Sequence, residues 1–215
     1  MSEADLHSGD SLAESIAADL KQRIVTGQLA AGERIVQNAV AEQYGVSRLP
    51  VREALRALSN SGLVDLEPSR GARVRPFDRA EMREVCLMRE QLEPMAIAEA
   101  VSRITPADLE EAAEILARME LSSPEDGNWL ALDRQFHTLW YDRLRMPLLH
   151  RTIDQLWDLA HRYRAAFSMT SGAREIADLE HHLMLHAIRR GAAEDVAAIL
   201  GVHLRHVRNS LETGQ

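Results

Sequence analysis

The chain of 215 residues contains few cysteines and no long apolar run, and each scarcity excludes a class of protein. Cys86 is the only cysteine, so no disulfide can form within the chain, which fits a reducing compartment. No apolar stretch approaches about 18 residues, which argues against a membrane span. The first ten residues are polar and lack the apolar core of a secretory signal. The sequence therefore predicts a cytoplasmic protein with no membrane contact.

Lysine is equally scarce, and nearly all positive charge is arginine because Lys21 is the only lysine. The net charge of −8 argues against a general nucleic-acid coat, since phosphate binding needs local positive charge. Residues 44–76 are an exception, because six arginines against three acidic residues give this segment a charge of +3. A basic patch in an acidic protein indicates a focused contact with nucleic acid.

Hydrophobic spacing and turn residues predict two domains after a flexible N-terminus at residues 1–10. Residues 11–76 have the pattern of three helices followed by two strands, which is a winged helix-turn-helix. Residues 77–215 show helical spacing with short breaks, and predict an antiparallel all-α bundle of about six helices. The fold class is mainly α. We expect the elements of the first domain at 11–26, 36–44, 47–61, 63–67 and 72–75. We expect the bundle helices at 78–102, 106–122, 126–144, 147–168, 173–190 and 194–212.

The third helix of the first domain has the features of a DNA-recognition helix. Ser47 can cap its start through the side-chain hydroxyl. Arg48, Arg52 and Arg56 then lie at i, i+4 and i+8 along one side, and we call them the arginine row. Apolar residues on the other side anchor the helix, as entry into a major groove requires. Arg48 and Arg52 are candidate base or phosphate contacts, and Arg56 is a candidate phosphate contact.

The turn between the two strands supplies further candidate DNA contacts. Arg70 and Gly71 lie at its tip, where Gly71 permits a close backbone approach to a minor groove. A solvated face of an ordinary helix is the alternative for the arginine row by itself. A second alternative is a helix-turn-helix that contacts protein instead of DNA. We favour a contact with DNA over both alternatives, because the arginine row occurs together with the preceding helices and the following strands.

Four polar residues on inward helix faces of the second domain form a candidate metal site. Asp133 and His137 are spaced i, i+4, so both can point at one ion. His181 and His203 share their faces with apolar residues, whereas His182 shares its face with polar ones and points outward. Buried groups of this kind need partners. Three histidines and an aspartate predict a divalent metal, with zinc first and nickel, manganese or iron as alternatives. Hydrogen-bonded core histidines are the other interpretation.

Residues 11–76 resemble the GntR family of bacterial transcription regulators. The resemblance is carried by Gly27-x-Leu29…Gly32-Glu33-Arg34, SRxPVREAL at 47–55, Leu58…Gly62-Leu63-Val64 and Gly71-Ala72-x-Val74. It implies a homodimer on a double-stranded operator with two-fold symmetry, with the third helix in the major groove and the turn tip in the minor groove. Leu49 departs from the family, where threonine is common and can donate to phosphate. Asn38 stands where some members carry an operator-touching arginine, and remains a candidate DNA contact.

Residues 78–212 resemble the all-helical FCD domain of the FadR-type branch of that family. The matching pieces are Arg89-x3-Glu93, Asp133-x2-Phe136-His137, Glu180-His181…Ala187-Ile188 and His203-Leu204. In that branch, positions matching Asp133, His137, His181 and His203 ligate a divalent metal that often meets a small carboxylate effector. Arg89 is the candidate second effector contact, because a guanidinium facing the site would clamp a carboxylate. Its alternative is an ion pair with Glu93 or Glu90.

These features predict a transcription regulator whose operator binding is controlled by a small organic acid at or near the metal. The resemblance favours a repressor that the effector releases, with activation as the alternative. A metal site with an open position could instead activate water in a hydrolase or lyase. We expect no enzyme, because the sequence shows no spare inward general base, no phosphate-binding glycine loop and no nucleophile signature.

Overall fold

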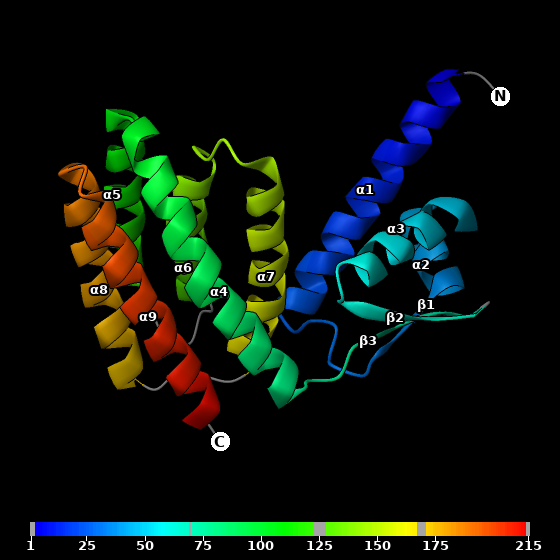
Figure 1. Cartoon of the computed structure of the whole chain (residues 1–215). Coiled ribbons are helices and arrows are strands. Elements are labelled where there is room, and N and C mark those ends of the chain that lie inside the picture. Colours follow the sequence, from blue (N-terminus) through cyan, green and yellow to red (C-terminus); the bar gives the residue numbers. More distant parts are fainter. Residues whose placement is uncertain (1–2, 69, 123–127, 167–170, 214–215) are drawn as a thin grey trace. The chain divides into compact units, whose positions relative to one another are not determined.

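The computed structural model describes residues 3–68, 70–122, 128–166 and 171–213, and the chain divides into two compact units after Asp78 (Figure 1). The first unit contains three helices and three strands within its described residues. They are α1 (Glu3–Val25), β1 (Arg34–Val36), α2 (Gln37–Tyr44), α3 (Arg48–Asn60), β2 (Val64–Glu67) and β3 (Gly71–Val74). None of the helices in the described part of the chain combines the length and apolar character that a membrane crossing needs.

The core of the first unit forms where α1 packs on α3. Ile16, Leu20 and Ile24 recur at helical spacing on α1 and are buried. Helix α1 begins at Glu3, whereas the sequence predicts a flexible N-terminus over 1–10; residues 1–2 lie outside the described residues. The segment before Ser11 contains no proline, so nothing prevents the helix from extending toward the N-terminus.

The wing of this unit, residues 64–74, belongs to a three-stranded antiparallel sheet with strand order β1-β3-β2. Ile35 of β1 and Leu66 of β2 both lie opposite Ala72 of the central strand. The two-strand ribbon expected from the sequence is therefore incomplete, and Val36 is in a strand, not a helix. Strand β1 was not predicted because three residues are too few for a recognisable alternation.

The turn between α2 and α3 ends one helix with glycine, as the sequence predicts. Gly45 has a φ of 65°, and its N–H and that of Val46 donate to carbonyls in the last turn of α2. Ser47 is the residue before α3, but its side chain makes no capping hydrogen bond, so the predicted hydroxyl cap is wrong. Helix α3 is held instead by its four buried apolar residues, Val51, Ala54, Leu55 and Leu58.

The second unit is all helical in its described residues. It comprises α4 (Arg79–Ala100), a short 3-10 turn (Val101–Arg103), α5 (Pro106–Leu121), α6 (Asn128–Tyr141), α7 (Pro147–Ala166), α8 (Ser171–Arg189) and α9 (Ala193–Thr213). The breaks follow the predicted turn residues; Thr105, for example, caps α5 in a capping box with Asp108. The break predicted at Ser123-Pro124 lies outside the described residues. The fold class predicted from the sequence is confirmed.

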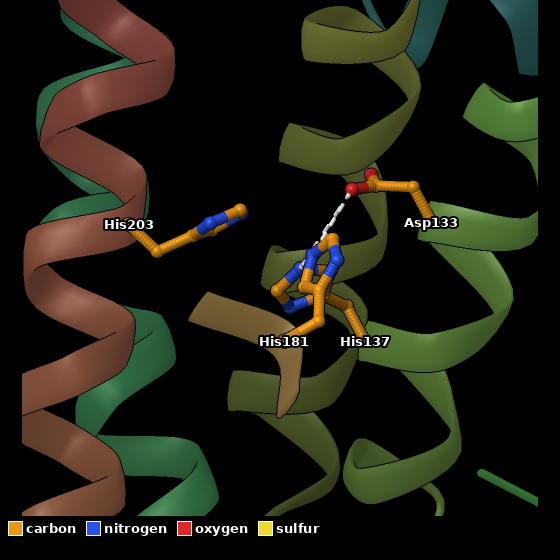
Figure 2. A group of neighbouring side chains, drawn as sticks. All are labelled: Asp133, His137, His181 and His203. Carbon is orange, nitrogen blue, oxygen red and sulfur yellow. Dashed lines mark hydrogen bonds and ion pairs between the residues drawn. The ribbon is translucent and has the colours of Figure 1, made fainter. Parts of the chain in front are cut away.

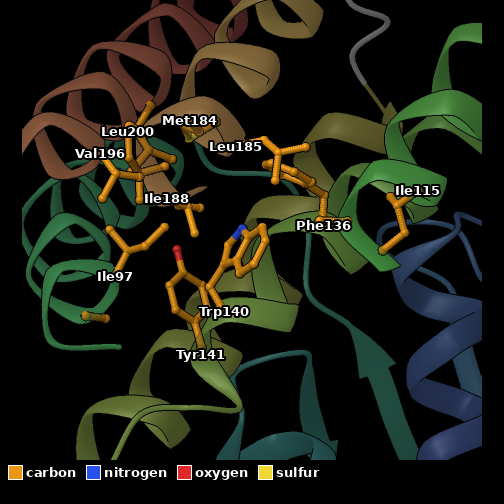
Figure 3. Packing of buried hydrophobic residues seen from close by; sticks show 14 of the residues in the cluster. Ile97, Ile115, Phe136, Trp140, Tyr141, Met184, Leu185, Ile188, Val196 and Leu200 are labelled. Atoms are coloured by element: carbon orange, nitrogen blue, oxygen red, sulfur yellow. The ribbon is translucent and has the colours of Figure 1, made fainter. Parts of the chain in front are cut away.

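Helix α6 lies at the centre of the core of the second unit. Phe136, Trp140 and Tyr141 are fully buried on it, among apolar side chains from α4, α5, α8 and α9 (Figure 3). Helices α4 and α8 both pack along α9, and α5 packs against α6 and α8. The inward face of α6 also carries Asp133 and His137, which are completely buried. The core therefore encloses polar groups that must be satisfied within it.

Candidate DNA-binding surface and metal centre

The arginine row lies on the exposed side of α3. Arg52 and Arg56 have side chains 54% and 55% exposed, and both contact Glu53, at 3.5 and 3.2 Å. Exposed ion pairs of this kind contribute only about 0.2–1 kcal/mol, so either arginine can exchange Glu53 for a phosphate or base. Arg48 makes no ion pair with any described residue and is also exposed.

A groove of about 640 Å³ runs between α3 and the wing. All three residues of the arginine row line it, together with Leu49 on α3 and Gly71 at the start of β3. The sequence expectation did not include Gln37, which also lines the groove and donates from its side-chain amide to the Arg48 carbonyl at 2.7 Å. No signal in the sequence marked this residue, because the bond joins α2 to α3 across the turn.

The remaining predicted DNA contacts are exposed in the same unit. Asn38 is exposed on α2, and Arg70 is exposed at the wing tip. Gly71 has a φ of 121°, and a Cβ there would lie 2.0 Å from the Ile35 carbonyl oxygen. The fold itself therefore requires glycine at position 71, because β3 approaches β1 too closely for a side chain.

Asp133, His137, His181 and His203, which we call the metal cluster, come together from α6, α8 and α9 (Figure 2). One ligand atom from each lies within 4.8 Å of the others, and all four residues are buried. The Nε2 atoms of His137 and His181 are 3.2 Å apart, and His181 Nε2 is 3.3 Å from Asp133 Oδ1. Ligand atoms about 2.0–2.1 Å from a tetrahedral zinc ion are themselves separated by about 3.4 Å. The spacing fits a shared divalent ion.

Poorly satisfied atoms in the metal cluster favour a bound ion over a set of hydrogen-bonded core histidines. Asp133 Oδ1 is buried and makes no well-aligned hydrogen bond with a described residue, and His181 Nε2 lies 3.3 Å from it. Its other oxygen, Oδ2, accepts from Arg164 Nη1 at 2.5 Å, and that arginine is buried as well. Because a buried carboxylate oxygen without a well-aligned donor is destabilising, Oδ1 is the atom that a metal ion would satisfy. His137 Nδ1 and His181 Nδ1 also lack partners among the described residues.

Glu180 holds the outer nitrogen of one cluster histidine. Its carboxylate accepts from His203 Nδ1 at 2.9 Å and from His206 Nδ1 at 2.6 Å. A carboxylate on one ring nitrogen fixes the tautomer of a histidine and frees the other nitrogen for a metal. The sequence alone did not place Glu180 behind His203, because this contact joins α8 to α9. His206 is half exposed, and His182 is 51% exposed and pairs with Glu120.

Charge states in the metal cluster suit ligation at neutral pH. Burial alone would raise the pKa of Asp133, but Arg164 and the neighbouring histidines hold it well below its usual range. Burial lowers the pKa of His203 to about 4 and, together with the other histidines, lowers that of His137. The aspartate is therefore ionised and these two histidines are neutral, which are the forms that bind metal ions.

Arg89 lies in a buried polar network that links α4, α6 and α7. Its Nε donates to Glu93 Oε1 at 2.5 Å, and its guanidinium stacks 3.9 Å from the centre of the Trp157 ring. Tyr141 and Trp157 donate to Glu93 Oε2 at 2.6 and 3.2 Å. The Glu93 ion pair that sequence reasoning kept as an alternative is therefore present. The Trp157 ring also lies 5.2 Å from that of His137, so the network adjoins the metal cluster.

Comparison with protein families matches both units. Residues 12–74 match "Bacterial regulatory proteins, gntR family", and residues 84–206 match "FCD domain". The chain belongs to the GntR family of bacterial regulators. Within this family, the regulator McbR of Escherichia coli K12 is 35% identical over 150 residues, covering 68% of this chain and 67% of McbR. The repressor RspR of the same strain is 25% identical over 211 residues, covering 97% and 92% of the two chains.

Solved GntR structures agree with the fold. The structure of E. coli McbR/YncC superposes with a TM-score of 0.81 at 30% identity, covering 94% of this chain and 97% of that one. A putative GntR regulator from Rhodococcus sp. RHA1 has a TM-score of 0.79 at 20% identity, covering 94% and 98%. Members and relatives are transcription regulators and not enzymes, so the hydrolase or lyase alternative is abandoned.

Proposed function

We propose that this GntR protein is a homodimeric regulator, acting in the bacterial cytoplasm, whose operator affinity is set by a small carboxylate. The carboxylate binds at or near a divalent metal ion in the FCD domain. The observation that carries the proposal is the metal cluster, in which four buried ligand atoms lie within 4.8 Å of one another. Asp133 Oδ1, which makes no well-aligned hydrogen bond with a described residue, supports metal binding over a hydrogen-bonded core.

The metal would be held by Asp133 Oδ1 and by imidazole nitrogens of the three cluster histidines. Zinc is the first candidate, with nickel, manganese and iron as alternatives, because imidazole and carboxylate ligands suit all four. Once bound, the ion supplies a fixed positive charge and a Lewis acid that can take a carboxylate oxygen as a further ligand.

The charges around the metal cluster favour an anionic effector. The negative charge of Asp133 is already balanced by its buried ion pair with Arg164, and Glu180 adds one negative charge behind His203. A divalent ion therefore leaves about one positive charge without a counter-charge at the site, which favours an anionic ligand. Arg89 is the proposed second contact: Glu93 occupies its Nε edge, and a guanidinium has further donors on its two Nη atoms.

The DNA-binding unit would place α3 in the major groove of each operator half-site. Arg48 and Arg52 would contact bases or phosphates, Arg56 would contact phosphate, and the wing tip at Arg70 would lie along the minor groove. Two copies require an operator with two-fold symmetry. Repression relieved by the effector is the favoured mode, supported by the relative RspR, which is described as a repressor.

The proposal is tested by measuring whether a small carboxylate releases the protein from its operator. The operator is first selected from random duplexes with purified, zinc-loaded protein. A panel of small mono- and dicarboxylates is then titrated against the protein–operator complex. We expect at least one to weaken operator binding by about 5- to 150-fold, the usual range for coupling between two sites. The same acid should leave the affinity of His181→Ala unchanged. Equal release from both proteins would contradict a metal-dependent effector site.

Glu180→Gln tests whether the carboxylate behind His203 supports the metal. The change removes a charge while keeping the size of the side chain, so metal affinity should fall by about 10- to 100-fold in competition with a chelator. Glu120→Gln is the matched control, because Glu120 also bonds a histidine, His182, but at an exposed position. Equal affinities in the two variants would show that the Glu180 contact does not support the metal.

A further inference from the structure

One exposed apolar side chain lies among the arginines of the surface proposed to contact DNA. Leu49 is the second residue of α3 and is 57% exposed. It precedes Arg52 by three residues, so the two side chains are neighbours on one face of the helix. Leu49 and all three members of the arginine row line the groove between α3 and the wing. Leu49 therefore shares the position of the arginines but cannot share their chemistry.

The same groove has further apolar lining. Leu66 of β2 is 47% exposed and lines it, and so does the buried side chain of Leu55 on α3. A single exposed leucine is common on a protein surface and needs no explanation. Three leucines in one groove, however, make part of its wall apolar. The groove therefore suits a ligand that presents hydrogen-bond acceptors to the arginines and a small apolar group beside them.

The major groove of DNA offers such a combination of groups. Guanine N7 and O6 are acceptors that suit arginine, and the C5-methyl group of thymine is the apolar group on the base edges. The first turn of a recognition helix is the part that meets those edges, and Leu49 lies in that turn of α3. Three helical residues span about 4.5 Å, against about 3.4 Å between base pairs. Leu49 would therefore meet a base within about two pairs of the one that Arg52 contacts.

We propose that Leu49 gives this regulator a preference for thymine, by covering the C5-methyl group of that base in the major groove. The inference rests on the proposed function, because it requires α3 to enter the groove. A phosphate contact at this position would be independent of the base sequence, whereas a contact with a methyl group depends on it. Leucine at position 49 therefore adds sequence discrimination next to the arginine row.

Deoxyuridine in place of thymine tests the proposal, because this change removes only the methyl group. Symmetric pairs of thymines in the selected operator are replaced in turn, and affinities are measured by fluorescence anisotropy at fixed salt. One pair should weaken binding of the native protein by about 15-fold, from about fourfold for each buried methyl group. Leu49→Ser should bind both operators equally, because its short polar side chain no longer covers the methyl group. Leu49→Met should retain the loss.

Leu12→Ser is the matched control and should also retain the loss, because Leu12 is an exposed leucine on α1 that does not line the groove. Circular dichroism establishes that the variants are folded. A native protein indifferent to every deoxyuridine pair, or a Leu49→Ser protein that keeps the loss, would overturn the proposal. Either result leaves the proposed function in place, since operator selection and Arg52→Ala test that separately. Failure to select any operator would overturn both.

Discussion

His181→Ala should remove the bound metal ion, whereas His182→Ala should leave it in place. The two residues are adjacent in the sequence but point to opposite sides of α8: His181 is fully buried in the metal cluster, and the His182 side chain is 51% exposed. After purification in zinc and dialysis, elemental analysis should find about one zinc per chain in the native protein and in His182→Ala. His181→Ala should hold almost none.

Thermal unfolding provides a second measurement of the same loss. A metal that binds only the folded state at 100 times its dissociation constant stabilises that state by about 2.7 kcal/mol. The native protein and His182→Ala should therefore unfold at a higher temperature with zinc than without it, and His181→Ala should not respond. His181→Asn, checked by circular dichroism, separates lost ligation from lost folding. Similar zinc content in the alanine variants at positions 181 and 182 would refute the assigned metal cluster.

Arg52→Ala should weaken operator binding by about 30-fold or more without unfolding the protein. Each arginine–guanine pair contributes about 1–3 kcal/mol of discrimination, and a dimer loses two. The side chain is half exposed and its ion pair with Glu53 spans 3.5 Å, so its removal leaves the core intact. Binding is measured on the selected operator by fluorescence anisotropy at fixed salt. Arg118→Ala, an exposed arginine on α5, is the matched control.

Comparison with Arg56→Ala separates recognition from anchoring. Loss of a phosphate contact should weaken operator and unrelated DNA alike and lower the salt slope by about one. Loss of a base contact should instead reduce the preference for the operator over unrelated DNA. Unchanged operator affinity in Arg52→Ala at matched salt would contradict the role of the arginine row.

Residues that share a helix could be assigned to faces from the sequence with good accuracy. The contrast between His181 and His182 follows from the 100° turn between neighbours and from the apolar residues three and four positions away. The arginine row was placed outward by the same reasoning. Such patterns are local, so the sequence contains all the information that they need.

Partners that come from different helices could not be predicted. Nothing in the sequence indicates that Arg164 of α7 balances Asp133 of α6, or that Gln37 of α2 bonds the backbone of α3. The pairing depends on how helices pack, which periodicity does not specify. The prediction that the Ser47 hydroxyl caps α3 was wrong for another reason. Ser47 does precede α3, but a capping hydroxyl must also adopt the rotamer that reaches the backbone.

The close approach at Gly71 links the wing mechanically to the recognition helix. The Ile35 carbonyl and the Gln37 N–H lie 2.0 and 3.0 Å from where a Cβ on Gly71 would be, so β3 rests directly on the β1–α2 junction. Gln37 in turn holds the Arg48 carbonyl. We therefore expect α3, the proposed major-groove contact, and the wing, the proposed minor-groove contact, to move together as one rigid unit. On that proposal, an operator whose two grooves are offset differently would have to deform to be bound, and the protein would select for DNA flexibility.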